Sequence, residues 1–205
     1  VIFLFLIIIK FTNPPIVQKI SFINYDFYQK VFNRGEVQDV TIVDIDEKSI
    51  AKVGQFPWRR DIYSIILKNL NQHNPKAIAF DIVFSEEDKQ NPKDLLLKLQ
   101  KESNELIDVE VADTNKIFVD SIKSSKIILP ILGEPKDNFV KNDSEPKVRI
   151  VTKGENPKNF IYKYKNKIIS LEEISNAASG IGSISLIPNI DGIIRNVPVL
   201  YNIDN

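Results

Sequence analysis

The 205-residue sequence has no cysteine, which excludes disulfide bonds, a thiolate nucleophile and zinc bound by cysteine. It has one histidine, His73, so a multi-histidine metal site is not expected. The position of His73 before Asn74 and Pro75 favours a helix-capping role instead. It also lacks a charge excess, since Lys plus Arg and Asp plus Glu both total 27. Duplex binding needs concentrated cations, so we predict no nucleic-acid partner.

The composition is otherwise that of a folded domain. Hydrophobic residues make up 43% and charged residues 26% of the chain, so a core can form. The length allows one sizeable α/β domain. We predict no cofactor.

The first nine residues, VIFLFLIII, contain no polar side chain and precede Lys10 and the helix-breaking pair Pro14-Pro15. Nine residues cannot span a bilayer, which takes roughly 20 apolar residues. Because the chain starts with Val1 and not with Met, we expect this run to be the outer end of a transmembrane helix whose first turns precede it. A signal-peptide core and a buried strand are the alternatives.

The segment after the two prolines has apolar residues every three or four positions, as one face of a helix does. They are Ile16, Ile20, Ile23, Phe27 and Val31, and a stop signal follows in the sequence NRG. We therefore predict the end of a transmembrane helix in residues 1–12, a helical stalk in residues 13–35 and an α/β domain in residues 36–205.

Two apolar, β-branched runs open the predicted domain. Residues 40–45 and 77–84 are predicted as strands, and Asp61 is expected to cap a helix between them. Strand, helix and strand within about 45 residues form a βαβ crossover. We therefore expect the two strands to be parallel neighbours.

Further elements are predicted downstream: helices in residues 93–102, 113–124 and 171–178, and strands in residues 127–131 and 160–164. Residues 134–159 are polar and are expected to form an excursion from the sheet. Asp191-Gly192, between two alternating apolar runs, predicts an antiparallel hairpin near the C-terminus. Because parallel strands need cover on both faces, the predicted fold is a layered α/β/α domain with a central, mainly parallel sheet.

Acidic residues follow both predicted strands and are the first candidates for a binding site. Ligands in open α/β sheets bind beyond the carboxyl ends of the strands, where Asp44 and Asp81 are expected. Asp46 lies two residues after Asp44 on the same side, so the pair could face one cation, with Asp81 as a third metal candidate. The alternative is structural: Asp46 caps the next turn, or an acid pairs with Arg59 or Arg60.

Three further residues are candidates for ligand binding. Trp58 and Arg60, in the string FPWRR, could form a recognition surface through stacking or cation–π contact. We favour the alternative that Trp58 plugs the edge of the core. Arg195 follows the predicted hairpin turn, where it could instead form a surface pair with Asp191.

An enzymatic alternative uses the same acidic residues. A hydrophobic strand followed by Asp-x-Asp resembles the first motif of haloacid-dehalogenase-like phosphatases. That resemblance implies Asp44 as nucleophile, Asp46 as general acid and magnesium beside them. The family has Thr or Val where Lys48 stands here, and the later acidic motif of the family is missing.

Several linked motifs resemble a second family. The strings VDIDE at residues 43–47, GQFPWRR at 54–60 and AIAFDIVFS at 77–85 occur in the order and spacing of CHASE domains of the second type. These are cyclase- and histidine-kinase-associated sensory extracellular domains. The string GSISLIPNIDGIIRNVP at residues 182–198 is similar to their C-terminal signature, and Tyr25-Asp26 to their usual opening. The family tends to have WPWPR where this chain has FPWRR.

This second resemblance implies a sensory domain without catalytic activity. It implies a place on the periplasmic side of the bacterial cytoplasmic membrane, in a receptor that regulates a cyclase, a histidine kinase or a protein kinase. The implied partners are the membrane and an unidentified small molecule or ion, and a homodimer is plausible because such outputs work as dimers. A degenerate sensor that keeps the fold without a ligand is the structural alternative.

Overall fold

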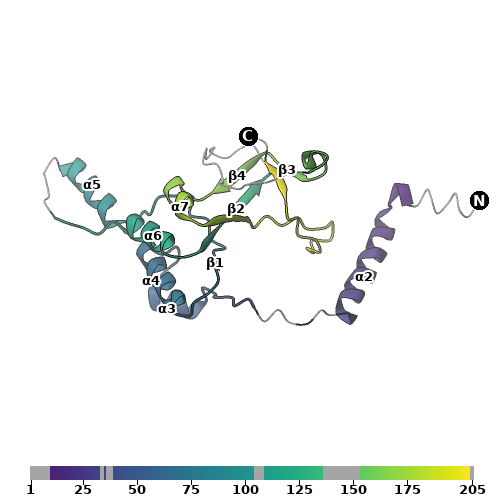
Figure 1. The fold of residues 1–205 in the computed structure, drawn as a ribbon, viewed down its shortest axis with the longest axis horizontal. Coiled ribbons are helices and arrows are strands. Elements are labelled where there is room, and N and C mark those ends of the chain that lie inside the picture. The colour runs from purple at the N-terminus through teal and green to yellow at the C-terminus, as the bar shows by residue number, and fades with distance from the viewer. Residues whose placement is uncertain (1–9, 33–34, 36–38, 104–108, 136–152, 204–205) are drawn as a thin grey trace, which may run out of the picture. The chain divides into compact units, whose positions relative to one another are not determined.

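The computed structural model describes residues 10–32, 35, 39–103, 109–135 and 153–203 (Figure 1). The apolar run of residues 1–9 and most of the predicted polar excursion lie outside these ranges. Within them, every helix is too short or too polar to cross a membrane. The chain divides into two compact units, Val1–Glu47 and Lys48–Asn205, which we describe separately.

The first unit contains the predicted stalk helix, α2 (Pro15–Val31). Pro15 occupies its first turn, where the missing N–H costs no hydrogen bond. The helix ends where the backbone N–H of Phe32 donates to the carbonyl oxygen of Tyr28. The predicted apolar face is present, and the side chains of Ile16, Ile23 and other members of this face are exposed in this unit.

The strand predicted at residues 40–45 is wrong. Residues 40–46 have no regular secondary structure, and Ile42 is 88% exposed. A strand needs the hydrogen bonds of a neighbouring strand, which β-branched residues favour but do not supply. The short helix α3 (Glu47–Val53) follows and ends at Gly54, whose positive φ of 113° suits glycine.

The second unit is built around strand β2 (Ile127–Glu134), which the sequence predicts. β2 pairs in parallel with β1 (Ile78–Ala79) and β5 (Gly180–Ser183), and antiparallel with β4 (Asn166–Ile169). A separate parallel pair joins β3 (Tyr162–Tyr164) to β6 (Tyr201–Ile203). The sheet is therefore mixed, although two of the three pairings around β2 are parallel. The layered arrangement stays a prediction.

Pro130 lies inside β2 at a position where its missing N–H removes no hydrogen bond of the sheet. β1 pairs with Ile127 and Ile128, and β4 pairs from Ile131 onward. The carbonyl of Ile128 accepts from Phe80, next to β1, so Pro130 two residues later faces the same edge. Pro130 thus stands in the gap between β1 and β4, where no ladder bond is lost.

The βαβ unit occurs one step later in the chain than predicted. β1 is short, with two residues, and its parallel neighbour is β2, not residues 40–45. The connection carries α5 (Pro92–Ser103) and α6 (Thr114–Lys123), both close to their predicted positions. Helix α4 (Arg60–Asn71) precedes β1, and α7 (Glu172–Ala177) precedes β5. A 3-10 turn, η1 (Pro157–Asn159), precedes β3.

The predicted hairpin near the C-terminus forms its turn but not its strands. Asn189 N–H donates to Ile193 and Gly192 N–H donates to Asn189, which closes the turn. The flanking residues 184–200 are outside any strand. Pro188 and Pro198 remove donors from both flanks, which weakens a ladder there.

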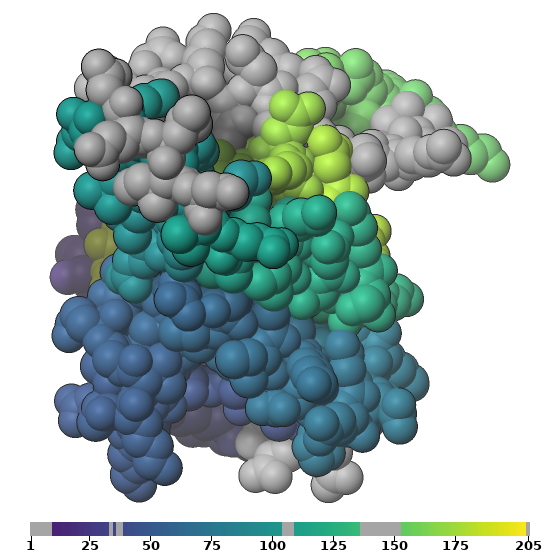
Figure 2. Space-filling view, turned by 90° about the vertical axis from the view of Figure 1, so that its left-hand side faces the viewer, coloured from purple at the N-terminus to yellow at the C-terminus, as the bar shows by residue number. Residues whose placement is uncertain are grey.

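An aromatic cluster forms the core of the second unit. Tyr63 of α4, Phe118 of α6 and Phe84 after β1 are each 1% exposed or less, and their ring centroids lie 4.9 to 5.8 Å apart. These edge-to-face and tilted contacts add to the area that the rings bury. The helical part of this unit, α3 to α6, is drawn in blue and teal (Figure 1). It covers much of the face seen in Figure 2.

Candidate functional site

The N-termini of α4 and α6 meet at one buried carboxylate, Asp88. The backbone N–H of Arg60 and the hydroxyl of Thr114 donate to Asp88 Oδ2, each at 2.9 Å. The backbone N–H of Gln90 donates to Oδ1 at 3.0 Å. Asp88 is 8% exposed, and the bonds from Arg60 and Thr114 are buried, whereas the bond from Gln90 is partly buried. The carboxylate lies at the N-terminal ends of two helices, where the helix dipoles are positive.

This carboxylate replaces a missing local cap. Arg59 is the N-cap residue of α4, but its side chain makes no capping hydrogen bond. Asp88, 28 residues further on, accepts from the N–H of Arg60, which has no partner within the helix. The arrangement ties the loop after β1 to both helices.

Asn91 extends this network and is 1% exposed. Its Oδ1 accepts from the backbone N–H of Thr114 at 3.1 Å, and its Nδ2 donates to Asp94 at 2.9 Å. Asp113, the N-cap of α6, accepts from Lys93 at 2.8 Å. The hydrogen bond from Lys93 lowers the pKa of Asp113 below its ordinary value. We name Asp88, Asn91, Thr114 and the Arg60 side chain the buried polar network.

Arg60, a predicted site residue, lies inside this network. Its Nη2 donates to the carbonyl oxygen of Glu86 at 2.8 Å, and its guanidinium lies 4.5 Å from the centroid of the Phe84 ring. Its Nε is buried without a hydrogen-bond partner. Burial lowers the pKa of Arg60, and the charge of Asp88 opposes that shift. The cation–π contact expected of the FPWRR string is thus made inside the protein.

Trp58 is buried as the plug interpretation predicts. It is 6% exposed, its Nε1 donates to the carbonyl oxygen of Gly54 at 2.7 Å, and its ring packs against Phe56 and Tyr63. Arg59 next to it forms a bidentate pair with Asp61 at 2.7 and 2.8 Å. That pairing lowers the pKa of Asp61 and raises the pKa of Arg59. The acid that pairs with Arg59 is therefore Asp61.

The remaining predicted site residues lie outside the buried polar network. Asp81 is exposed beyond β1, and Arg195 makes a bidentate pair with Asp191 at 2.8 and 2.9 Å. Arg195 lowers the pKa of Asp191. Asp44 and Asp46 belong to the first unit and are exposed. A ligand-binding role for these residues stays a prediction.

The geometry does not support the phosphatase motif. Asp44 and Asp46 follow an irregular segment and not the strand that would hold a nucleophile in place. Over the described ranges, no group of three or more His, Asp or Glu side chains is placed to hold a metal ion.

Sequence reasoning placed Arg60 near acidic strand ends but missed its neighbours Asp88, Asn91 and Thr114. Three acids follow the second predicted strand, and nothing local distinguishes Asp88 from Glu86 or Glu87. The available signal was Asp113-Thr114 at the start of an amphipathic helix, which is a typical N-cap pattern. Long-range capping has no sequence signature.

One of three comparisons with known proteins agrees with the motif resemblance. No curated protein and no solved structure was found to match this chain. The model of one family, described as the CHASE2 domain, matches residues 1–204. The chain therefore belongs to the CHASE2 family of extracellular sensory domains of receptors.

Proposed function

We propose that this chain is the periplasmic signal-input domain of a bacterial transmembrane receptor whose output is a cyclase, a histidine kinase or a protein kinase. The observation that carries this proposal is the family match over residues 1–204. The apolar run VIFLFLIII supports it as part of a membrane anchor.

The proposed mechanism is a population shift. A ligand that binds one packing of the domain more tightly than another changes the populations of both, and the change reaches the output through the membrane segments. The buried polar network supports this idea because it connects three chain segments at one carboxylate. Two copies of the receptor would pair, since the proposed outputs act as dimers.

Topology is the first test. Reporter fusions placed after Asn205 in the full-length receptor should be active with a periplasmic reporter such as alkaline phosphatase. They should be dark with a reporter that folds only in the cytoplasm. The opposite pattern would contradict the proposed placement.

The second test separates a sensor from the phosphatase alternative. The purified chain should not hydrolyse p-nitrophenyl phosphate in the presence of magnesium. The Asp44→Asn variant serves as the control for a contaminating activity. Hydrolysis that disappears in that variant would overturn the sensor proposal in favour of an enzyme.

A further inference from the structure

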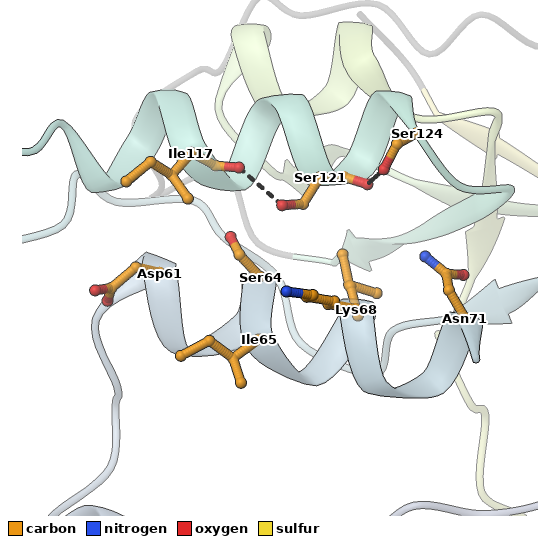
Figure 3. A pocket seen from close by; sticks show the side chains of 9 residues that line it. Asp61, Ser64, Ile65, Lys68, Asn71, Ile117, Ser121 and Ser124 are labelled. Atoms are coloured by element: carbon orange, nitrogen blue, oxygen red, sulfur yellow. Dashed lines mark hydrogen bonds between the residues drawn. The ribbon is translucent and has the colours of Figure 1, made fainter. Parts of the chain in front are cut away.

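A groove runs between α4 and α6 (Figure 3). Its volume is about 490 Å³, within the range of small-molecule sites. It is lined by one face of each helix: Asp61, Ser64, Ile65, Leu67, Lys68 and Asn71 of α4, and Ile117, Ser121 and Ser124 at or beyond α6. None of these residues belongs to the site predicted from the sequence.

The groove is preformed because its two walls are clamped at both ends. Asp88 binds the N-terminal ends of α4 and α6 through Arg60 N–H and the Thr114 hydroxyl. At the other end, the side chain of Asn71 donates to the hydroxyl of Ser125. The two helices therefore run parallel, and a ligand would not have to order them.

The groove is hollow because small side chains stand where larger apolar ones would fill it. Ser64 and Ser121 face each other across the gap, with the fully buried Leu67 among the lining residues (Figure 3). The Ser121 hydroxyl donates to the carbonyl oxygen of Ile117 at 2.9 Å, and the Ser124 hydroxyl donates to the backbone carbonyl oxygen of Ser121 at 2.8 Å. Each hydroxyl has one proton, so its oxygen is left to accept from a ligand.

Lys68 supplies the charge of the groove. Asp61 at one end is already paired with Arg59, whereas Lys68 has no ion-pair partner in the part of the chain that the structure describes. Its ammonium group lies along the groove, toward Ser64 (Figure 3). The partly exposed Ile65 and Ile117 add apolar surface at the rim.

We propose that this groove binds a small organic carboxylate that carries hydroxyl or amino donors on an apolar body. The carboxylate pairs with Lys68, the donors meet the oxygens of Ser64 and Ser121, and the apolar part covers Ile65 and Ile117. This assignment rests on the proposed sensor function and names the site and ligand class for it.

The test measures the thermal stability of the full 205-residue chain in the presence of each of three probes. These are sodium lactate, sodium 3-hydroxybutyrate and zwitterionic leucine. At least one should raise Tm, by roughly 5–10 °C at a hundred-fold excess over its Kd. Lactamide, which keeps the donors but lacks the charge, should leave Tm unchanged. If no probe raises Tm, or if lactamide acts as the carboxylates do, the proposal is wrong.

Three variants locate the binding. Lys68→Gln should abolish the Tm rise, and Ser121→Leu, which fills the groove, should do the same. Lys98→Gln on α5, an exposed lysine elsewhere, should keep the full response. An unchanged response in Lys68→Gln would overturn the assignment. The reporter-fusion result is independent of these binding measurements. If no probe binds the groove, the ligand assignment is wrong but the sensor function is not contradicted. A cytoplasmic location of the domain would contradict the sensor function, whatever the groove binds.

Discussion

Helices α4 and α6 and the segment of residues 184–200 are all rich in apolar residues, but they bury these residues to very different extents. In α4 and α6, Tyr63, Leu67, Phe118 and Ile122 are each 1% exposed or less. In the C-terminal segment, seven large apolar side chains are exposed: Leu186, Ile190, Ile193, Ile194, Val197, Val199 and Leu200.

The difference shows what regular structure contributes to burial. A helix repeats its apolar face every turn, so one neighbouring helix or sheet covers several residues together. An irregular segment has no such face, and the turn at Asp191 is held by a bidentate pair with Arg195. We therefore expect substitutions in the helical part to affect stability far more than those in residues 184–200.

The largest effect is expected from Phe118→Ala. Phe118 is fully buried against Tyr63 and Phe84, so removing its ring leaves a cavity and should cost about 3–5 kcal/mol of unfolding free energy. Urea denaturation of the full chain measures it. Phe160, which is 77% exposed, provides the control: Phe160→Ala should stay within about 0.5 kcal/mol of the parent. Similar losses of stability in both variants would contradict the position of Phe118 in the core.

Asp88→Ala should come next, with a loss of about 2–4 kcal/mol. The change leaves the N–H of Arg60 and the hydroxyl of Thr114 without their acceptor, and leaves the Arg60 guanidinium without its nearby negative charge. The same denaturation measurement applies, and exposed Asp81→Ala is the matched control. A loss no larger than that of Asp81→Ala would mean that Asp88 does not hold the helices.

Gly133→Ala should cost about 1–3 kcal/mol, as overpacking does. A Cβ at this position would lie 2.2 Å from Cδ2 of the buried Tyr164 ring, which must then move. Gly182→Ala on β5 is the control, since its Cβ would meet only Ile128 at an ordinary 3.6 Å. Adding Tyr164→Leu to Gly133→Ala should restore part of the loss. No restoration would show that the ring is not the obstacle.

Acid should weaken the helical part by a smaller amount. The folded-state pKa values of Asp61 and Asp113 are lowered, so their contribution is complete above the ordinary carboxyl pKa of about 3.9 and is lost as the pH falls through the lowered values. Stability measured from neutral pH down to about pH 3 should therefore decline, and Asp113→Asn should flatten that decline. An equally steep decline in Asp113→Asn would contradict the assignment to this group.

The smallest effect is expected from Asp191→Ala. Asp191 lies at the surface, where ion pairs contribute little, and Arg195, whose side chain is 5% exposed, has a further interaction besides this pair. The Tm of Asp191→Ala should equal the parental Tm within error. High salt should shift the Tm of both proteins by the same amount. A clear fall in Tm would show that residues 184–200 are more tightly integrated than the comparison suggests.

Much of the fold is predictable from local patterns, and the failures are instructive. The helices at residues 15–31, 60–71, 92–103 and 114–123 follow their apolar periodicity closely. The strands were harder. Residues 40–45 have the more typical strand composition, yet it is the proline-containing β2 that forms the centre of the sheet. Helical hydrogen bonds close within a segment, whereas a strand depends on a partner elsewhere in the chain.

By itself, the sequence determined where the helices lie, that the stalk has an apolar face, and which motifs connect the chain to CHASE2 domains, because all three depend on residues near one another. Only the tertiary structure decided that Asp88 caps α4 and binds α6, that the Arg60 guanidinium is buried against Phe84, and that small serines leave a groove beside Lys68. Those outcomes depend on segments far apart in the sequence competing for the same space and the same hydrogen-bond donors, and no local pattern carries that information.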